Sequence, residues 1–583
     1  MGSTTAPATR QAPQSTAAKL GGFADSRLGL SAVIKGNARK IFPDHWSFML
    51  GEIALYSFVI LLLTGVFLTF FYIPSVGLVE YDGPYEPMQG KIVSEAFAST
   101  VNMSFEVRGG LLMRQIHHWS ALVFVAATVV HMARVFFTGA FRRPRELNWV
   151  VGAILALLAI FEGFAGYSLP DDLLSGTGLR IAAAIILAIP VIGTYVHFMA
   201  FGGEFPGEAF IPRLYTIHVL LLPAVFLALI AAHLFLVVLH KHTQYPGPGR
   251  TNNNVVGYPL LPVYIAKAGG FFFIVFGVIA LISALVQINP VWSYGPYDPS
   301  PVTAGSQPDW YMGWLDGAVR VMPGWLEVQA FGWTLSGNIL LPAVVLPGLL
   351  TTVLIAYPWI ERLATGDARE HHLLDRPRNA PTRTGLGVMA LTFYMILWAN
   401  GGNDIIATHL DLSINDITRF TGVMMFLAPP LAFVITKRIC LGLQRRDRDR
   451  VLHGVETGQV FRLDTGEVLE RHARMSAYDQ WQLVQFESYA PVEPGPAVDA
   501  NGVKRKGAWA DGVRRRISRF YFEDRVEPVT PAELATAHGH GDHDAIEAGH
   551  DSPDSHDSPD SPDSPDSLDS SSRTRREVGS GQA

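Results

Sequence analysis

Two apolar stretches organise this chain: LLMRQIHHWSALVFVAATVVHMARVFF at residues 111–137 and LYTIHVLLLPAVFLALIAAHLFLVVLH at residues 214–240. Each is long enough to cross a bilayer as a helix. The first carries His117 and His131, 14 residues apart, and the second carries His218 and His233, 15 apart. At about 3.6 residues per turn, both spacings return close to the same helix face about 21 Å further along. Two such helices lying antiparallel would oppose His117 to His218 and His131 to His233, a geometry that suits two stacked haems with bis-imidazole ligation.

Packing in the membrane interior is the alternative explanation for these histidines. A titratable side chain at bilayer depth is costly and usually has a function. A single histidine would leave the question open, but four at matched spacings on two spans favour ligands. A permease that uses the histidines as a proton relay is a further alternative.

Composition indicates a membrane protein and limits the type of cofactor. Of the 583 residues, 49% are hydrophobic and 16% are charged, which is too apolar for a soluble protein of this length. Cys440 is the only cysteine, which excludes internal disulfides, a Cys-ligated iron–sulfur cluster and covalent c-type haem attachment. Any haem is therefore a non-covalent b-type haem, and an iron–sulfur or cytochrome c partner must be a separate chain.

Hydropathy predicts an all-α membrane protein with eight transmembrane helices, the first four forming a diheme four-helix bundle. The predicted spans are 48–72, 111–138, 148–169, 214–240, 268–289, 337–360, 384–403 and 418–440. A ninth apolar stretch, 181–201, is broken by Pro190 and Gly193 and is predicted to be a surface hairpin. The loops after the second, fourth and sixth spans are basic, which places these loops and both termini in the cytoplasm.

Five segments follow from this topology: a cytoplasmic N-terminal arm (1–45), the diheme bundle (46–240), a C-terminal membrane region (241–442, with a long loop at 290–336), a cytoplasmic extension (443–530) and a tail (531–583). The tail is rich in His, Asp, Ser and Pro and should be disordered, because it cannot bury a core. Weak divalent-metal binding and a solvated tail are both compatible with its histidines, and the second is favoured; they are His538, His540, His543 and His550.

Glycines and arginines accompany the histidines. Two glycine pairs, in the first and third spans, also have a spacing of 14: Gly51 and Gly65, and Gly152 and Gly166. A porphyrin edge needs a close approach to the backbone, which glycine permits, although glycine also serves helix packing. Arg114 and Arg134 each lie three residues from a histidine, where a guanidinium can pair with haem propionates or anchor the helix at the interface.

Two acids stand out. Asp309 lies in the loop sequence QPDWY at 307–311, at a predicted membrane edge, where it could accept a proton from a quinol hydroxyl. Glu162 is the only acid inside the third span, four residues before Gly166. A place on a proton path and a polar helix contact are both open for Glu162.

Over about residues 40–440 the sequence resembles cytochrome b of quinol–cytochrome c reductase. The histidine pairs, the four glycines and the two arginines carry the resemblance, with three short motifs: GYSLP at 166–170, IPVIG at 189–193 and PDWY at 308–311, which resembles the P-E-W-Y quinol-site motif. The resemblance implies quinol oxidation on the positive side near the His117/His218 haem, with Asp309 and Tyr311 as catalytic residues. The site would be completed by Gly178, Pro308 and Trp310.

The resemblance also implies quinone reduction on the cytoplasmic side near the His131/His233 haem, at His240 and Lys267. Electrons would bifurcate between a Rieske iron–sulfur protein and the haem chain, contributing to the proton-motive force. Three features depart from the mitochondrial type: Asp309 in place of Glu, the 15-residue spacing, which looks like the photosynthetic branch, and Ala268 in place of an Asp.

Eight spans and a long C-terminal extension look most like the actinobacterial type. That likeness implies menaquinol as donor, a diheme cytochrome c partner and a supercomplex with a haem–copper oxidase. We expect a dimer in the plasma membrane, in contact with lipids and without nucleic-acid partners. A diheme b-type anchor of another quinone-linked dehydrogenase is the nearest alternative, and the 308–311 motif argues against it.

Overall fold

The computed structural model describes residues 38–247, 249–300, 307–330, 332–484, 491–493, 498, 501–524, 526–530 and 532–537, with scattered positions between 15 and 36. The chain divides into two units, Met1–Pro528 and Val529–Ala583. The described residues of the second unit include a helical stretch at 532–537. The four tail histidines discussed above lie outside the described residues.

Eight helices in the described part of the chain are long and apolar enough to span a membrane, which confirms the predicted number. Four spans are single helices: α5 (Gly110–Phe137), α6 (Glu146–Tyr167), α16 (Pro381–Gly401) and α18 (Ile414–His453). The others combine η1 (Trp46–Phe48) with α3 (Met49–Thr69), α9 (Phe210–Thr216) with η3 (Ile217–Leu221) and α10 (Leu222–His240), η4 (Leu260–Tyr264) with α11 (Ile265–Leu285), and α14 (Gly337–Leu340) with η6 (Leu341–Val345) and α15 (Leu346–Thr365).

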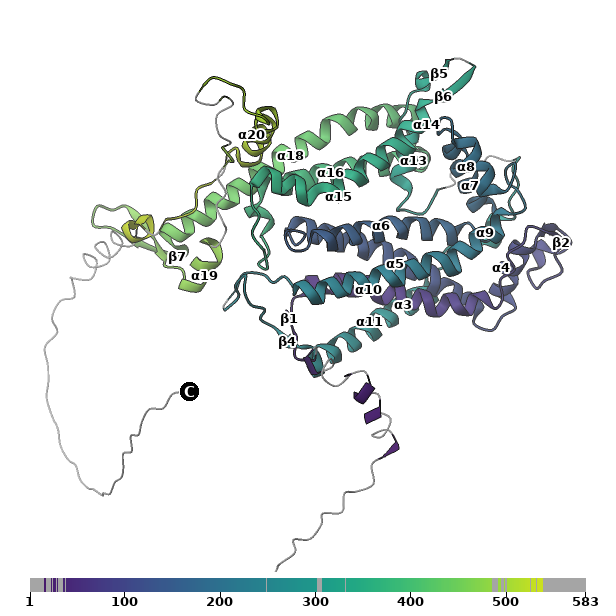
Figure 1. The fold of residues 1–583 in the computed structure, drawn as a ribbon, viewed down its shortest axis with the longest axis horizontal. Coiled ribbons are helices and arrows are strands. Elements are labelled where there is room, and N and C mark those ends of the chain that lie inside the picture. Colours follow the sequence, from purple (N-terminus) through teal and green to yellow (C-terminus); the bar gives the residue numbers. More distant parts are fainter. Residues whose placement is uncertain are drawn as a thin grey trace, which may run out of the picture. The chain divides into compact units, whose positions relative to one another are not determined.

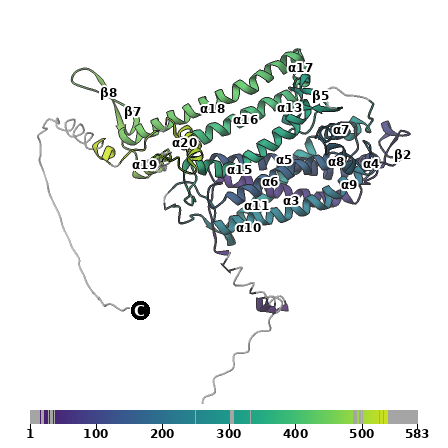
Figure 2. The ribbon, with the colours of Figure 1, turned by 45° about the horizontal axis from the view of Figure 1, so that its top comes forward.

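The first four spans form a bundle, as Figures 1 and 2 show. In it α3 packs on α5, α5 on α6 and α6 on α10, while α11 covers α3 and α5. α16 and α18 pack together, and α15 contacts α6. We call the end of the bundle that carries Asp309 the loop end, and the opposite end, which carries Arg145, the basic end.

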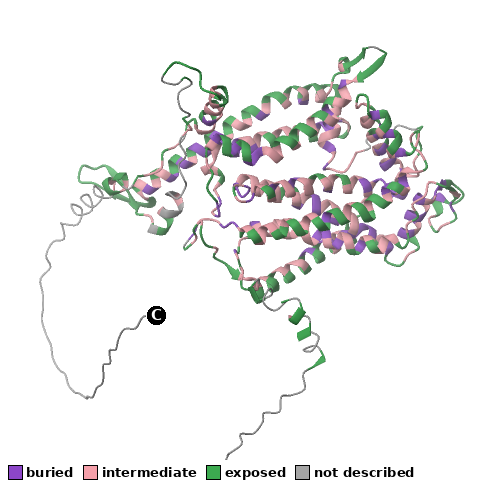
Figure 3. Ribbon diagram, viewed as in Figure 1, coloured by how far each residue is buried: buried purple, intermediate pink, exposed green. Residues whose placement is uncertain are grey.

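Exposed residues are spread along the spans (Figure 3), and many of them are large and apolar. Leu220, Phe235 and Phe273 are each more than 60% exposed. Exposing so many large apolar side chains to water would be unfavourable, whereas contact with lipid is favourable. The helices satisfy their own backbone hydrogen bonds, as a lipid environment requires. The chain is therefore a multi-pass membrane protein.

The stretch at 181–201 does not span, as predicted. It forms the end of α7 (Leu173–Leu187) and α8 (Gly193–Phe201), two short helices in contact with each other. The connection between them contains Pro190, which lacks the N–H that a continuous helix needs.

The loop end carries most of the remaining short elements. They are β2 (Leu78–Glu80) paired with β3 (Ile92–Ser94), η2 (Glu86–Met88), α4 (Glu95–Phe105), α12 (Val291–Tyr294), α13 (Gly313–Arg320), η5 (Gly324–Leu326), β5 (Glu327–Ala330) paired with β6 (Trp333–Ser336), and α17 (Asn403–Leu410). Elsewhere β1 (Ile41–Phe42) pairs with β4 (Tyr258–Pro259). Hydropathy did not predict these antiparallel strand pairs, because their strands are short and lie outside the apolar windows.

The boundary predicted at 442 falls inside a continuous helix, since α18 runs on to His453. Beyond it lie β7 (Val455–Arg462) paired with β8 (Val468–Ala473), then α19 (Ala477–Val484) and α20 (Ala508–Phe522). α20 packs on α15 and α16. Tyr521 at its end donates a hydrogen bond of 2.9 Å to Glu361 on α15, so the extension is fastened to the membrane region.

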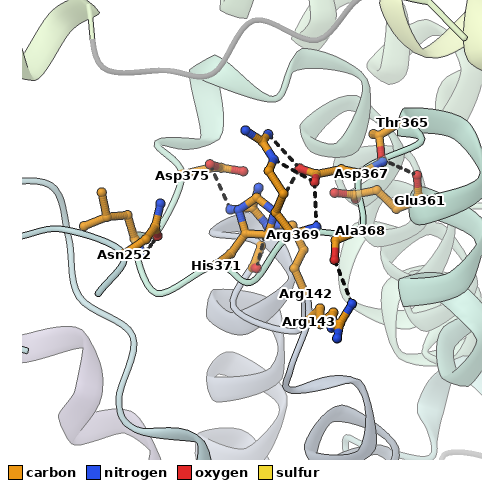
Figure 4. A network of polar contacts seen from close by, with 12 residues as sticks. Arg142, Arg143, Asn252, Glu361, Thr365, Asp367, Ala368, Arg369, His371 and Asp375 are labelled. Carbon is orange, nitrogen blue, oxygen red and sulfur yellow. Dashed lines mark hydrogen bonds and ion pairs between the residues drawn. The ribbon is translucent and has the colours of Figure 1, made fainter. Parts of the chain in front are cut away.

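A polar network surrounds this attachment at the basic end (Figure 4). Arg142 lies 3.0 Å from Asp375, and Arg143 donates to the carbonyl of Ala368. η7 (Pro377–Asn379) leads from this network into α16, where buried Arg383 binds both oxygens of Glu361 at 2.7–3.2 Å. The network joins the loops after the second and sixth spans.

Candidate functional site

His117 and His218 face each other inside the bundle. His117 projects from α5 and His218 from η3, and their ring centroids are 6.2 Å apart with the rings at 79°. Two metal–imidazole bonds of about 2.0 Å, with about 1.1 Å from each nitrogen to its ring centroid, require about 6.2 Å between centroids. The separation of the two rings would therefore fit a single iron held between them.

The unequal histidine spacings have a local cause. η3 is a π-helical turn, and it begins one residue before His218. A π turn holds one more residue than an α turn, so it absorbs the extra residue between His218 and His233. The two histidines therefore return to one face of the span, as His117 and His131 do on the regular helix α5.

Each of the four predicted glycines faces one of the four histidines. A Cβ atom at Gly65 would lie 3.2 Å from His117 Cε1, and one at Gly166 would lie 2.5 Å from His218 Cε1. At the other level the corresponding distances are 3.0 Å from Gly51 to His131 and 3.5 Å from Gly152 to His233. Glycine thus leaves room for an imidazole ring at each place, and a larger residue at Gly166 would collide with it.

The second level of the bundle, formed by His131 and His233, lies toward the basic end. His131 Nδ1 is buried and has no hydrogen-bond partner among the described residues. His233 faces the backbone carbonyl of Asn148 without a full hydrogen bond. Unsatisfied ring nitrogens in an apolar bundle are costly, and a metal ligated by the opposite ring nitrogens would orient both rings.

Three phenylalanines separate the two histidine levels. On α3, Phe58 lies midway between Gly51 and Gly65; on α5, Phe124 lies midway between His117 and His131; and on α10, Phe226 lies about midway between His218 and His233. The ring centroids of these phenylalanines are 5.5–5.8 Å apart. They form the centre of a buried cluster that also contains Tyr311. The bundle thus has a packed aromatic layer between its two levels of histidines.

Arg114 and Arg134 lie beside the two levels, at opposite ends of α5. Arg114 donates to the carbonyl of Asn289 at 2.6 Å, while its Nε has no partner in the described chain. Arg134 donates to Ser47 at 3.3 Å and lies 4.5 Å from the ring centroid of Phe48, and its Nη2 is also unpartnered there. Each arginine thus keeps a buried donor that fits a propionate.

The loop residues Asp309 and Tyr311 come together as a pair. Tyr311 Oη donates to Asp309 Oδ2 at 3.0 Å, and His118 Nε2 lies 3.7 Å from Asp309 Oδ1. Tyr311 is buried against Gly163 of α6. Its burial is the main reason, and the charge of Asp309 the second reason, why the pKa of Tyr311 is raised well above the usual range. Tyr311 therefore keeps its proton and acts as a donor to Asp309. Sequence reasoning missed His118 and Gly163, whose roles depend on contacts between helices.

Trp310 and Gly178 occupy the surroundings of this pair. The carbonyl of Trp310 accepts from Trp398 Nε1 at 2.9 Å, and Gly178 lies on α7 against Tyr167.

Two acids lie in the corner between α6 and α7. Burial raises the pKa of Asp171 to about 6. Asp172 caps α7 by accepting hydrogen bonds from the backbone N–H groups of Leu174 and Ser175. The corner after the third span therefore contains a buried acid whose pKa lies above the usual range of an aspartate.

At the basic end, His240 and Lys267 lie on different spans. His240 ends α10, and its buried Nδ1 has no hydrogen-bond partner within the described ranges. Lys267 on α11 is half exposed and pairs with Asp44 at 2.6 Å. Sequence reasoning missed Asp44, because the ion pair joins residues that are far apart in the chain.

The chain is similar to known proteins over most of its length. The family model "Cytochrome b(N-terminal)/b6/petB" matches residues 122–296. The chain is 56% identical over 523 residues to the cytochrome bc1 complex cytochrome b subunit of Streptomyces coelicolor, covering 89% of this chain and 96% of the relative. The same-named subunit of Mycobacterium tuberculosis is 52% identical, covering 78% of this chain and 83% of the relative.

A solved structure gives the same fold. A chain of a hyperthermophilic respiratory complex III superposes with a TM-score of 0.54 at 20% sequence identity, covering 72% of this chain and 99% of that chain. At that identity the likeness concerns the fold alone.

Proposed function

Because the chain belongs to the cytochrome b subunits of bc1 complexes, which are quinol–cytochrome c oxidoreductases, we propose that it holds two b-type haems and serves a quinone site at each end of its bundle. Quinol is oxidised at the loop end, and its electrons divide between a Rieske protein and the haem chain. Quinone is reduced at the basic end, and the cycle contributes to the proton-motive force. The quinone in this proposal is menaquinone.

The facing pair His117 and His218 is the observation that carries the proposal. Their separation of 6.2 Å suits one iron, and His131 with His233 would hold the second. When bound, the haems supply one-electron transfer between ferric and ferrous iron. The two arginines, Arg114 and Arg134, would bind the propionates through their unpartnered nitrogens.

Asp309 is the proposed proton acceptor for quinol. Tyr311 holds Oδ2 of the carboxylate by a hydrogen bond, which fixes its orientation and leaves Oδ1 toward His118. A positioned carboxylate within reach of a hydroxyl is what general-base catalysis requires. Pro308, Trp310 and Gly178 complete the proposed site.

His240 and Lys267 are the proposed polar groups of the quinone-reducing site, near His131 and His233. The ion pair of Lys267 with Asp44 supplies a carboxylate on the same side of the bundle as Ala268, where the mitochondrial type has an acid. Both are half exposed, as proton exchange with the cytoplasm would require.

The assembly in this proposal contains a Rieske subunit and a diheme cytochrome c, in a dimer that joins a haem–copper oxidase. The basic loops support a plasma-membrane orientation with the basic end and both termini in the cytoplasm. Bulk lipid would cover the exposed apolar faces of the spans.

Visible spectra of purified histidine variants test this function. His117→Ala and His218→Ala should each remove the same b-type component from the dithionite-minus-ferricyanide spectrum, and His131→Ala and His233→Ala should each remove the other. If His117→Ala and His218→Ala removed different b-type components, the proposed pairing of these two histidines would be wrong. A haem-free native protein would instead favour a permease, and haem without quinol:cytochrome c activity in the intact complex would favour a membrane anchor.

A further inference from the structure

Glu162 contacts a proposed haem ligand directly. Its Oε1 lies 3.1 Å from His218 Nδ1, and both side chains are largely buried, with 20% and 16% of their surfaces exposed. Glu162 and Gly166 are one helical turn apart on α6, and both face the ring of His218. The other carboxylate oxygen, Oε2, has no hydrogen-bond partner in the described residues.

The position of Glu162 inside a membrane span requires an explanation. A carboxylate inside a membrane span is costly and is normally paired or functional. Within the described ranges, the imidazole of His218 is the only ionisable group paired with Glu162. Its position is therefore best explained by the histidine that it contacts.

The four histidines differ in what their rings face. Thr64 Oγ1 lies 2.9 Å from His117 Nδ1 and donates its own proton to the carbonyl of Ile60, so it accepts from the ring. His218 Nδ1 lies 3.1 Å from Glu162 Oε1, although the contact does not have the geometry of a full hydrogen bond. At the other level, His131 Nδ1 and His233 Nδ1 also lack a full hydrogen bond in the part of the chain that is described. Among these four rings, as far as the described residues extend, His218 alone contacts an anion.

We propose that Glu162 is a positioning residue that fixes the ring of His218 and lowers the reduction potential of the haem at the loop end. This inference rests on the proposed function, in which His218 is a haem ligand. A carboxylate beside the distal nitrogen of a metal-bound imidazole orients the ring and makes it a stronger donor. A stronger donor and a nearby negative charge both stabilise ferric over ferrous iron, so the reduction potential falls.

Two other roles for Glu162 make different predictions. As a proton acceptor for quinol, it would change the rate of quinol oxidation and leave both haem potentials unchanged. As a helix-packing residue, it would change haem content or stability and leave the potential of any bound haem unchanged. The haem potentials therefore separate the three roles.

The experiment is a redox titration of the purified complex, monitored by visible and EPR spectra, for Glu162→Gln, Glu162→Asp and Thr64→Val. Glu162→Gln keeps the shape and removes the charge. It should retain both haems and raise the potential of the loop-end haem, giving at least a tenfold higher ratio of reduced to oxidised haem at fixed potential, or 59 mV for a one-electron couple. Its EPR signal should move as well, because the ring of His218 is less firmly held.

The other variants and an internal control sharpen the test. Glu162→Asp keeps the charge and should restore most of the native potential, and Thr64→Val should cause a smaller rise, because a hydroxyl is a weaker acceptor. The basic-end haem should stay unchanged, as should both haems in Glu146→Gln, which alters an acid at the far end of the same helix. An unshifted loop-end potential with both haems bound, or an equal shift of both haems, would overturn the inference.

Two further outcomes are also decisive. If Glu162→Gln loses the loop-end haem, then Glu162→Asp and Thr64→Val carry the test, and native potentials in both would overturn the inference. A native complex that lacks a b-type haem ligated by His218 would refute the proposed function instead, whatever the potentials of the variants.

Discussion

Asp309 shows how one residue can be tested apart from its surroundings. General-base removal costs about 10²–10⁴-fold in rate, so Asp309→Asn should slow quinol oxidation by about 10²-fold or more and leave haem content unchanged. Asp309→Glu should keep most activity. Steady-state quinol:cytochrome c turnover across pH 6–8, with a parallel haem spectrum, measures both.

Asp298 provides the matched control, because it is an exposed acid of the same loop region that binds Ser300. Asp298→Asn should leave turnover unchanged. Asp316 is a weak substitute acceptor, since it already pairs with Arg320 at 2.8 Å. Unimpaired turnover in Asp309→Asn would remove Asp309 from the mechanism.

Residues that act through spacing on one helix could be predicted from the sequence, whereas residues that act across helices could not. The four histidines and four glycines repeat at intervals of 14 or 15 residues, and the structure brings each glycine to one histidine. Thr64, His118 and Gly163 carry no such pattern. Their roles arise from the rotation of α3, α5 and α6 about their axes, which hydropathy does not determine.

At the scale of the element, the π turn of η3 predicts an asymmetry between two deletions. Removing Leu220 should convert η3 to a regular α turn, restore the 14-residue spacing and preserve both haems. Removing Val129 from α5 should instead rotate His131 by about 100° relative to His117 and lose one haem. Both residues are more than a third exposed, so loss of core packing should be small in each case.

Haem-to-protein ratios of the purified deletion variants provide the measurement. Equal haem loss in both would show that the π turn does not absorb the extra residue. The sequence revealed the unequal spacing but not its cause, because a π turn depends on backbone geometry rather than on a residue pattern. The number of spans could be predicted because each span leaves a visible pattern in the sequence, a run of about 20 mostly apolar residues.

For the whole molecule, the attachment of α20 depends on a buried ion pair. Arg383 and Glu361 are each 4% exposed, and Tyr521 binds the same carboxylate. Breaking one partner of a buried pair costs about 3–5 kcal/mol, so Arg383→Met should strongly lower the melting temperature of the detergent-solubilised protein. Tyr521→Phe should cost about 1.5–3 kcal/mol or more, because it removes a hydrogen bond to a charged group and also the hydrogen bond between the hydroxyl groups of Tyr521 and Tyr357.

Arg419 supplies the control, because its ion pair with Asp416 is exposed on both sides. Arg419→Met should leave the melting temperature nearly unchanged. A similar melting temperature for Arg383→Met and the native protein would show that α20 is held by other contacts. Sequence reasoning predicted an extension after the last span but not this attachment, in which Tyr521 contacts a carboxylate 160 residues earlier in the chain.

The helix that presents His218 and His233 is weakly held by the rest of the chain. In the most apolar 18-residue part of the span Phe210–His240 only 6% of the residues are buried within the chain, compared with 22% for Gly110–Phe137. A cofactor that bridges both spans would therefore supply much of the adhesion between them, and a group bound at about 1,000 times its Kd adds about 4 kcal/mol to the folded state. With the proposed haems, assembly of the subunit would depend on haem supply, because without haem the fourth span would have fewer contacts with the bundle and would be more open to quality-control proteases.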